Sequence, residues 1–458
     1  MKSSKDCIII GAGITGLTAA YYLQKAGKNI LVLEENDRVG GVIRTIRENG
    51  FLYETGPNTG VLGQPEAALL FDDLKDTIEL EVANDSVKKR YILKGGQWHA
   101  MPSGLKQAIR TPLYTTGDKL RILGEPFRRR GKDPEETLED LVHRRMGKSF
   151  LDYAVDPFIL GVYAGDPGKL VPKYALPKLY NLEQTYGSFI GGSVKKKLEK
   201  KSEIQKKATR EVFSVKGGLQ SLVDALYESS GPENYILNTR GTRVFRAGQG
   251  FKVEYFDDQN KRQVFESSKI IVTTGSHSLN HLLPDIGPEI MDPLTDLRYA
   301  RVIEVAIGFK EWNGMQPDGF GGLIPFREKR DLLGILFPSA FLEGRAPASG
   351  ALFTVFIGGV RRPKLFDLKD QELFELVGRE FTQLMGIDRF KPDLFKSFKY
   401  PWAIPQYEQS SGARFKAISH VEQQFPGLLL RGNFQGGIGL ADRIKQGKQA
   451  ALQIIDRS

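Results

Sequence analysis

The sequence predicts an α/β protein with a parallel sheet, and three observations near its beginning support that fold class. The apolar run Cys7–Ile10 is typical of a buried parallel strand. A turn with Gly11, Gly13 and Gly16 in G-x-G-x-x-G spacing follows, and a helical pattern then leads to a second strand, Ile30–Leu33. Together these elements indicate a Rossmann-like unit that binds a dinucleotide.

Each part of this unit has a physical role. Gly11 permits the tight turn, Gly13 lets the backbone approach a pyrophosphate, and Gly16 lets the helix pack close to the strand. The N-terminus of the helix offers free N–H groups to the phosphates. Glu34, at the end of the second strand, can accept hydrogen bonds from the adenosine ribose and would repel a 2′-phosphate.

The residues after the second strand distinguish between dinucleotides. Arg38 and the pair Gly40-Gly41 add a cation and bare backbone beside the pyrophosphate, and Gly56-Pro57-Asn58 comes soon after. This continuation resembles the FAD-binding start of the flavin amine oxidase superfamily, which includes carotene desaturases and protoporphyrinogen oxidases. The resemblance implies non-covalent FAD, because the single cysteine, Cys7, lies in a strand and leaves no candidate for a thioether link.

The resemblance also implies a set of FAD-binding residues. Asn58 stands where animal members carry an arginine, so we expect only its backbone to contact the cofactor. The expected cofactor-binding residues are Gly11, Ala12, Gly13, Ile14, Thr15, Gly16, Glu34, Glu35, Arg38, Gly41, Val42, Gly56, Pro57, Asn58, Thr59, Val244, Gly432, Ile438, Gly439 and Leu440. The last four belong to a glycine-rich turn and a helix whose N-terminus would point at the flavin ring.

Composition limits the remaining possibilities. A chain of 458 residues can form two or three domains, and 40% hydrophobic residues are ordinary for a globular protein. No run of 18 apolar residues suggests a membrane-spanning helix, and the first strand begins too early for a signal peptide to precede it. One cysteine fits a reducing compartment such as the cytoplasm, and five scattered histidines form no metal-binding pattern.

The net charge of +10 is concentrated in one segment. Residues 84–210 contain 26 Lys and Arg against 14 Asp and Glu, an excess of +12 that leaves −2 for the rest of the chain. Such a segment suggests an anionic partner, either a lipid surface or a polycarboxylate substrate. Nucleic acid is not expected, because no recognised binding motif accompanies the charge.

Later stretches resemble the protoporphyrinogen oxidase family more specifically. They include G-V-Y-A-G-D-P at 161–167, I-P-Q-Y at 404–407 and G-N-F-Q-G-G at 432–437, and the similarity runs through the whole chain in order. It is nearest to the form that takes protoporphyrinogen rather than coproporphyrinogen.

The resemblance implies three domains. A discontinuous Rossmann-like FAD-binding domain comprises 1–83, 211–278 and 399–458. A mainly helical domain for membrane association and substrate access comprises 84–210, which is the basic segment, and a sheet-rich α+β substrate-binding domain comprises 279–398. We therefore expect peripheral attachment to the cytoplasmic membrane, and a homodimer is compatible with this arrangement.

Five residues carry the expected substrate contacts. Arg90 matches an arginine that pairs with a substrate propionate; the alternative is an ordinary surface arginine in the run Lys88-Lys89-Arg90. Gly161 matches a glycine whose backbone faces the reacting part of the substrate. Leu323, Leu336 and Phe356 match apolar residues that enclose the macrocycle, and pattern alone would place them in a core.

The implied reaction is FAD-dependent oxidation of protoporphyrinogen IX to protoporphyrin IX, with dioxygen as acceptor, in haem biosynthesis. It centres on the flavin and requires no dedicated catalytic side chain. Three alternatives stay open: oxidation of coproporphyrinogen III, oxidation of an amine or carotenoid on the same fold, and a flavoprotein without catalytic activity.

Overall fold

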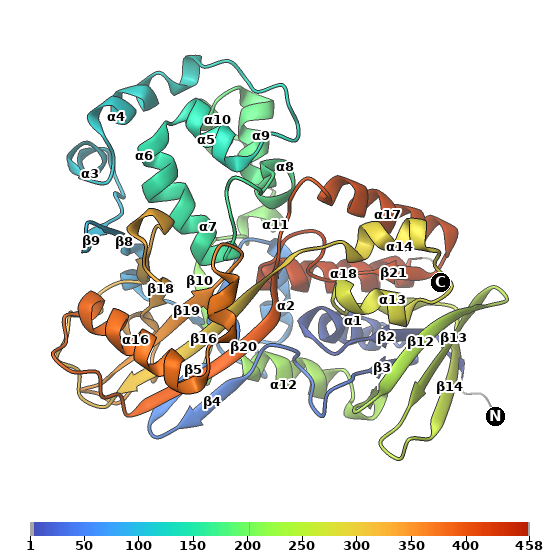
Figure 1. Ribbon diagram of the computed structural model, residues 1–458. Coiled ribbons are helices and arrows are strands. Elements are labelled where there is room, and N and C mark those ends of the chain that lie inside the picture. The colour runs from blue at the N-terminus through green and yellow to red at the C-terminus, as the bar shows by residue number, and fades with distance from the viewer. Residues whose placement is uncertain (1–3, 201, 457–458) are drawn as a thin grey trace.

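A five-stranded parallel sheet forms one half of the molecule (Figure 1). The computed structural model describes residues 4–200 and 202–456. The sheet has the order β11-β3-β2-β15-β21, with bounds Tyr235–Ile236, Ile30–Leu33, Cys7–Ile10, Ile270–Val272 and Leu428–Leu430. Its strands come from three separated parts of the chain, and almost every residue in them is buried, as apolar strands covered on both faces must be.

Different layers cover the two faces of this sheet. One side carries α1 (Ile14–Lys25), α2 (Pro65–Asp73), α12 (Gln220–Ser229) and α18 (Leu440–Ile455). The other side carries α13 (Leu279–Leu282), α14 (Pro288–Thr295), α17 (Ser411–Gln424) and a sheet in the order β1-β14-β13-β12, in which β1 and β14 are parallel and the other pairs antiparallel. Those strands span Ser4–Lys5, Arg262–Ser267, Gly250–Phe256 and Arg240–Ala247, and the last three form an antiparallel insert between β11 and β15 of the parallel sheet.

A seven-stranded sheet forms the second half, in the order β20-β16-β19-β18-β17-β8-β9. The strands span Leu394–Pro405, Tyr299–Phe309, Ala351–Gly358, Leu332–Leu336, Gly321–Leu323, Arg90–Lys94 and Gln97–Ala100. Helix α16 (Asp370–Met385) packs its apolar side on this sheet, and α15 (Pro338–Phe341) contacts β19. Strands β8 and β9 form a hairpin that pairs with β17 of this sheet, although the expected domain boundaries place residues 90–100 with the helical segment.

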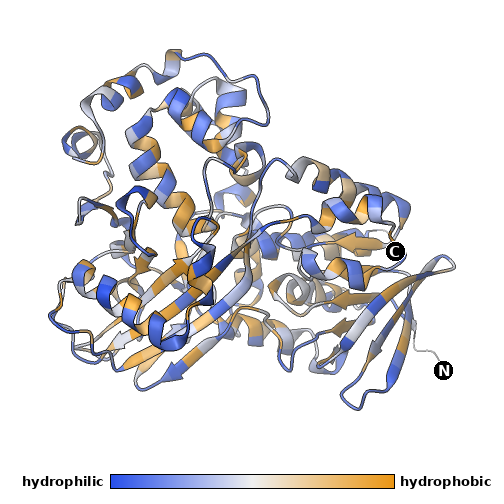
Figure 2. Ribbon diagram, viewed as in Figure 1, coloured by the Kyte–Doolittle hydropathy of each residue, from blue (hydrophilic) through white to orange (hydrophobic). Residues whose placement is uncertain are grey.

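Short strands join the two halves. The antiparallel pair β4 (Thr45–Glu48) and β5 (Phe51–Glu54) contacts β16, and β10 (Val212–Val215) pairs with both β6 (Gly60–Val61) and β7 (Leu80–Val82). Figure 2 shows that apolar residues concentrate in the strands of both sheets, whereas the outer surfaces of the helices are mostly polar.

The segment between the hairpin and β10 is mainly helical, as expected. Its helices are α3 (Leu105–Arg110), α4 (Thr116–Leu123), α5 (Leu138–Arg145), α6 (Lys148–Phe150), α7 (Asp156–Tyr163), α8 (Pro172–Ala175), α9 (Pro177–Tyr186), α10 (Phe189–Leu198) and α11 (Glu203–Lys206). Helix α5 begins at Leu138, where the hydroxyl of Thr137 accepts a hydrogen bond from the Asp140 N–H and caps the helix. No helix in residues 4–200 and 202–456 is long and apolar enough to cross a membrane.

Candidate functional site

The glycine-rich turn after β2 has the geometry that its sequence predicts. Gly11 has φ +100°, and a Cβ there would lie 2.8 Å from Thr273 Oγ1. A Cβ on Gly16 would overlap the carbonyl oxygen of Gly11, so only glycine lets α1 approach β2 this closely. A Cβ on Gly13 would meet no atom within 4 Å, so Gly13 presents bare backbone to open space. No side chain caps the start of α1, which leaves its first N–H groups available to an anion.

A second glycine loop lies directly beside this turn. The N–H of Gly40 donates to the carbonyl of Ala12 at 2.8 Å, and Gly41 lies against Gly13. The guanidinium of Arg38 donates to the carbonyls of Gly41, Val39 and Ile43, so its direct role is to brace the loop. The side chain of Val42, in the same loop, points away from the core and is 56% exposed.

Glu34 is buried at the end of β3, and its side chain holds the glycine-rich turn after β2 in place. Its Oε2 accepts a hydrogen bond from the N–H of Ala12 at 2.7 Å, and its Oε1 accepts from the N–H and the side-chain amide of Asn36. Glu35 is exposed. Thr239, which sequence reasoning missed, donates from both its N–H and its hydroxyl to the carbonyl of Glu34. Its position just after the strand Tyr235–Ile236 was the available signal.

Val244, another expected cofactor-binding residue, lies on β12. Its side chain is buried among the apolar residues of the core, next to Phe251 and Leu283. Trp402 is a stronger candidate that sequence reasoning missed. It is 54% exposed and stacks on His277, which follows β15 at the carboxyl edge of the parallel sheet, with ring centroids 4.1 Å apart.

The C-terminal glycine-rich segment reaches the same edge. A Cβ on Gly432 would lie 3.0 Å from the carbonyl of Thr274, just beyond β15, and the Gly432 N–H donates to Gln446 Oε1. Helix α18 begins at Leu440, directly after Gly439, and packs against α1 because Gly447 has no side chain to overlap the carbonyl of Thr15. Helix α18 thus packs on the start of α1, and the uncapped N-terminus of α1 beside Gly13 fits the pyrophosphate of FAD.

The loop from Gly56 to Thr59 connects this edge to the second sheet. A Cβ on Gly56 would overlap the carbonyl of Val42, whereas Pro57 and Thr59 are half-buried. Asn58 is buried, and its Nδ2 donates to the carbonyl of Gly56 at 3.1 Å and to Glu304 Oε1 at 2.7 Å.

Glu304 is a functional candidate that sequence reasoning missed. It lies on β16, is 3% exposed, and has a pKa raised well above its ordinary value, first by burial and then by the nearby carboxylate of Glu54. Thr354 on β19 completes the group, since its hydroxyl donates to Asn58 Oδ1 at 2.8 Å. A single acid inside the apolar run of β16 was the signal.

The three apolar residues expected at the substrate occupy one face of the seven-stranded sheet. Leu323 on β17, Leu336 on β18 and Phe356 on β19 are each the only half-buried residue of an otherwise buried strand. Leu323 pairs with Gly334 and Gly334 with Phe356, so these residues form one row across three strands. Gly161 on α7 faces this row, because a Cβ on it would overlap the side chain of Leu323.

Arg90 lies at the end of the neighbouring row on the same face. It pairs with Gly321, which pairs with Leu336, so the guanidinium and the apolar row share one side of the sheet. Its guanidinium lies 5.3 Å from the ring centre of Phe320, and partial burial lowers its pKa. Among the residues that the structure describes, no carboxylate forms an ion pair with it. The structure thus brings together a cation without an acidic partner and an apolar face.

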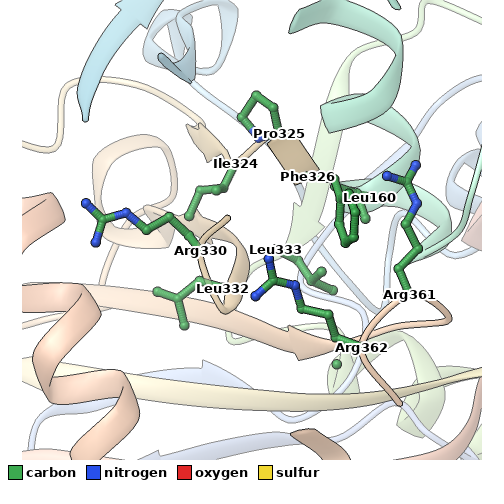
Figure 3. A pocket seen from close by; sticks show the side chains of 10 residues that line it. Leu160, Ile324, Pro325, Phe326, Arg330, Leu332, Leu333, Arg361 and Arg362 are labelled. Carbon is green, nitrogen blue, oxygen red and sulfur yellow. The ribbon is translucent and has the colours of Figure 1, made fainter. Parts of the chain in front are cut away.

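A small pocket near the start of α7 offers a contrast (Figure 3). Leu160 and Phe326 line it together with Arg361 and Arg362, whose guanidinium groups lie over the ring of Phe326. Arg361 pairs with Asp156, and Arg362 pairs with Asp331. Because these charges are already neutralised, the pocket attracts an anion less strongly than Arg90 does.

Comparisons with known proteins agree with this geometry. The family described as flavin containing amine oxidoreductase matches residues 14–455. Protoporphyrinogen oxidase 2 of Arabidopsis thaliana is 30% identical, covering 99% of this chain and 94% of the relative. Coproporphyrinogen III oxidase of Bacillus subtilis is 26% identical over 98% of both chains. A crystal structure from Exiguobacterium sp., whose protein has a provisional protoporphyrinogen oxidase name, superimposes over 100% of both chains with a TM-score of 0.82 at 22% identity.

The comparisons confirm the α/β fold class with its FAD-binding region, and they confirm FAD as the cofactor of an oxidoreductase. The individual cofactor and substrate residues stay predictions. FAD supplies the two-electron acceptor, while the residues described above bind, orient and desolvate.

Proposed function

Because this chain belongs to the flavin containing amine oxidoreductase family, we propose that it oxidises protoporphyrinogen IX to protoporphyrin IX, with dioxygen as the electron acceptor. One observation carries the proposal: Arg90, without a carboxylate partner among the described residues, shares a sheet face with the half-buried Leu323, Leu336 and Phe356. A flat apolar ring with a propionate at its edge matches both features. An amine or a carotenoid would leave the guanidinium unused.

The residues around this face have distinct roles in the proposal. The guanidinium of Arg90 binds a propionate and sets the orientation of the ring. Leu323 and Phe356 contact the macrocycle, and the bare backbone of Gly161 lets α7 pack directly on Leu323 beside this face. FAD, when bound, would supply the acceptor for a hydride from a bridging carbon, and a pyrrole N–H of the substrate would release its proton to solvent. The chain's own contribution is orientation and the exclusion of water.

Coproporphyrinogen III is the second candidate substrate, and the charge distribution favours it. It carries more propionates than protoporphyrinogen IX, and residues 84–210 carry the +12 excess of basic residues. The relative from Bacillus subtilis bears the name of this activity.

A fluorescence assay tests the proposal. The purified protein, loaded with FAD, is given each porphyrinogen without oxygen and then in air, and porphyrin emission is recorded. We expect the flavin absorbance to bleach anaerobically and porphyrin emission to appear in air, faster with protoporphyrinogen IX. Faster turnover of coproporphyrinogen III would select the second candidate, and bleaching with neither would contradict both.

We also propose that the helical segment 84–210 binds a membrane surface. Its exposed apolar residues include Leu120 and Leu123 on α4, Phe127 just after it, and Val194 and Leu198 on α10. Phe127 is 90% exposed and precedes three arginines, while α10 ends in three lysines. Apolar side chains among cations suit an anionic lipid interface. In Figure 1, α4 and α10 lie at the same end of the molecule.

Vesicle flotation tests this surface. We expect binding to phosphatidylserine-containing vesicles that weakens with salt and is lost in Phe127→Asp combined with Leu123→Asp. Leu452→Asp, at an exposed leucine of α18 far along the chain, is the control and should float as the wild type does. Equal flotation of the double variant would contradict the proposal.

A further inference from the structure

Two arginines are buried behind the glycine-rich segment 432–437, and neither has a carboxylate in ion-pair contact within the described part of the chain. Arg414 on α17 is 0% exposed, and Arg443 on α18 is 8% exposed. A guanidinium keeps its proton inside proteins, so each brings a full positive charge into the interior. Buried arginines are normally paired, which makes this arrangement unusual.

Both side chains hold the backbone of that segment. Arg443 Nη2 donates to the carbonyls of Gln435 and Gly437 at 2.8 and 2.6 Å. Arg414 Nε donates to the carbonyl of Phe434 at 3.0 Å. Arg414 Nη1 and Arg443 Nε are themselves buried and have no hydrogen-bond partner among the described residues. The segment is therefore fixed by two charges that its carbonyls only partly satisfy.

The other ionisable groups around the segment do not cancel these charges by contact. The hydroxyl of Tyr407 donates to the carbonyls of Asn433 and Gly437, and that of Tyr299 donates to Asn433 Oδ1. Burial raises the pKa of Tyr407 to about 12 and also raises that of Tyr299, so both are neutral near pH 7. Asp442 acts on Arg443, and Asp296 and Glu408 act on Arg414, only through longer-range attraction.

We propose that Arg414 and Arg443 are positioning residues that hold segment 432–437 against the flavin and maintain a positive field there, which stabilises the negative charge that the flavin gains on reduction. Charges fixed in a low-dielectric interior act strongly at short range and need no reorganisation when the electrons arrive. The inference rests on the proposed function in one respect, namely that FAD lies against this segment.

The midpoint potential of the bound flavin, measured against a reference dye without any porphyrinogen, tests the inference. We expect Arg443→Gln and Arg414→Gln to lower the potential, because the positive field weakens. Arg443→Lys should retain most of the wild-type potential near pH 7, although it disturbs the same hydrogen bonds. A higher midpoint potential in Arg443→Lys than in Arg443→Gln would show that the charge matters. If Arg443 only held the loop in place, both variants would change the potential equally.

Arg431 provides the matched control. It is buried to the same 8% exposure and precedes Gly432 directly, but Glu422 neutralises it. We expect the double variant Arg431→Gln with Glu422→Gln, which removes a neutral pair, to leave the midpoint potential close to that of the wild type. Unchanged potentials in both Arg414→Gln and Arg443→Gln would overturn the inference, whichever porphyrinogen is oxidised. A lowered potential in a protein that oxidises no porphyrinogen would contradict only the proposed substrate.

If the Gln variants do not fold, the inference can be tested by measuring the midpoint potential of Arg443→Lys as a function of pH. A buried lysine loses its proton at lower pH than an arginine does, so its charge disappears first. The midpoint potential of this variant should then fall increasingly below that of the wild type as the pH rises to about 10. Parallel curves over this range would overturn the inference.

Discussion

Asn58 and Glu304 are 246 residues apart in the chain and share a buried hydrogen bond of 2.7 Å between the amide Nδ2 and the carboxyl Oε1. The bond joins the loop expected to bind FAD to the sheet face expected to bind substrate. With Thr354 bound to the other end of the amide, the orientation of Asn58 is fixed. Burial raises the pKa of Glu304 well above its ordinary value, which favours the neutral carboxyl at this junction.

The stability of the protein should depend on which residue replaces Glu304. Glu304→Gln keeps an oxygen that accepts from Asn58, so we expect a melting temperature close to that of the wild type. Glu304→Ala leaves the buried amide unsatisfied and should cost about 1–3 kcal/mol of unfolding free energy. Urea denaturation of the two variants measures the difference. An equal loss in both would show that the carboxyl is ionised in the folded protein.

Glu54 should make stability depend on pH in the direction opposite to that of a salt-bridged acid. Burial raises its pKa from 4.5 to about 7, although Leu219 N–H and Thr45 Oγ1 donate to it. The folded state therefore holds a proton that the unfolded state releases, so this contribution is complete below pH 4.5 and is lost as the pH rises to about 7.

The Glu54 contribution amounts to about 3 kcal/mol at most. Unfolding free energies measured from pH 5 to pH 8 should fall in the wild type relative to Glu54→Gln. Parallel pH profiles for the two proteins would contradict a raised pKa.

The two glycines that flank the start of α1 should separate cofactor binding from folding. Gly13→Ala meets no neighbouring atom and has φ −71°, so the protein without cofactor should keep or slightly raise its stability, by about 0.5–1 kcal/mol. Its affinity for FAD should fall, because the added methyl group occupies the approach of the pyrophosphate.

Gly16→Ala is the counterpart, because its Cβ overlaps the backbone of Gly11. We expect it to cost about 1–3 kcal/mol even without FAD. Thermal melting of the cofactor-free proteins and titration with FAD measure the two effects separately. Loss of stability in Gly13→Ala, or unchanged FAD affinity, would argue against the expected site.

Removal of the unpaired guanidinium should weaken substrate binding with little effect on folding. Arg90→Ala should raise the KM for a porphyrinogen roughly tenfold, about 1.4 kcal/mol, because Arg90 is exposed and its interaction is partly screened. Lys89→Ala is the control, since the neighbouring Lys89 is already paired with Asp318. Initial rates over a range of substrate concentrations test both. The same KM in wild type and Arg90→Ala would remove Arg90 from the substrate site.

Gly161 and Leu323 should be coupled in catalysis. A methyl group on Gly161 overlaps Leu323, and the leucine side chain must then move towards the substrate face. Gly161→Ala should therefore lower kcat/KM more than it lowers the melting temperature. Leu323→Ala creates space, so the double variant should recover part of the loss, with a coupling of about 1 kcal/mol. Additive effects in the double-mutant cycle would contradict a shared site.

The nucleotide unit was predictable from the sequence because its signal is local. Gly11, Gly16 and Glu34 lie within one strand–helix–strand unit, and each spacing follows from the geometry of a tight turn. The structure reproduces the predicted bounds of β2 and β3. Arg90, Gly161 and the apolar row could be found only through a resemblance, since pattern alone treats them as surface or core.

Other features depend on which distant residues the fold brings together. Nothing near Glu304 in sequence predicts Asn58 as its partner, and nothing near Arg414 or Arg443 shows that these arginines are buried without an acid. The hairpin Arg90–Ala100 likewise joins the second sheet only because β17, more than 200 residues later, offers it an edge. The sequence by itself determined the nucleotide-binding unit and the glycines predicted to hold its ligand, because local spacing encodes turn and helix geometry. Only the tertiary structure decided which charges are buried and which have an acidic partner, because burial and pairing are properties of the packed chain.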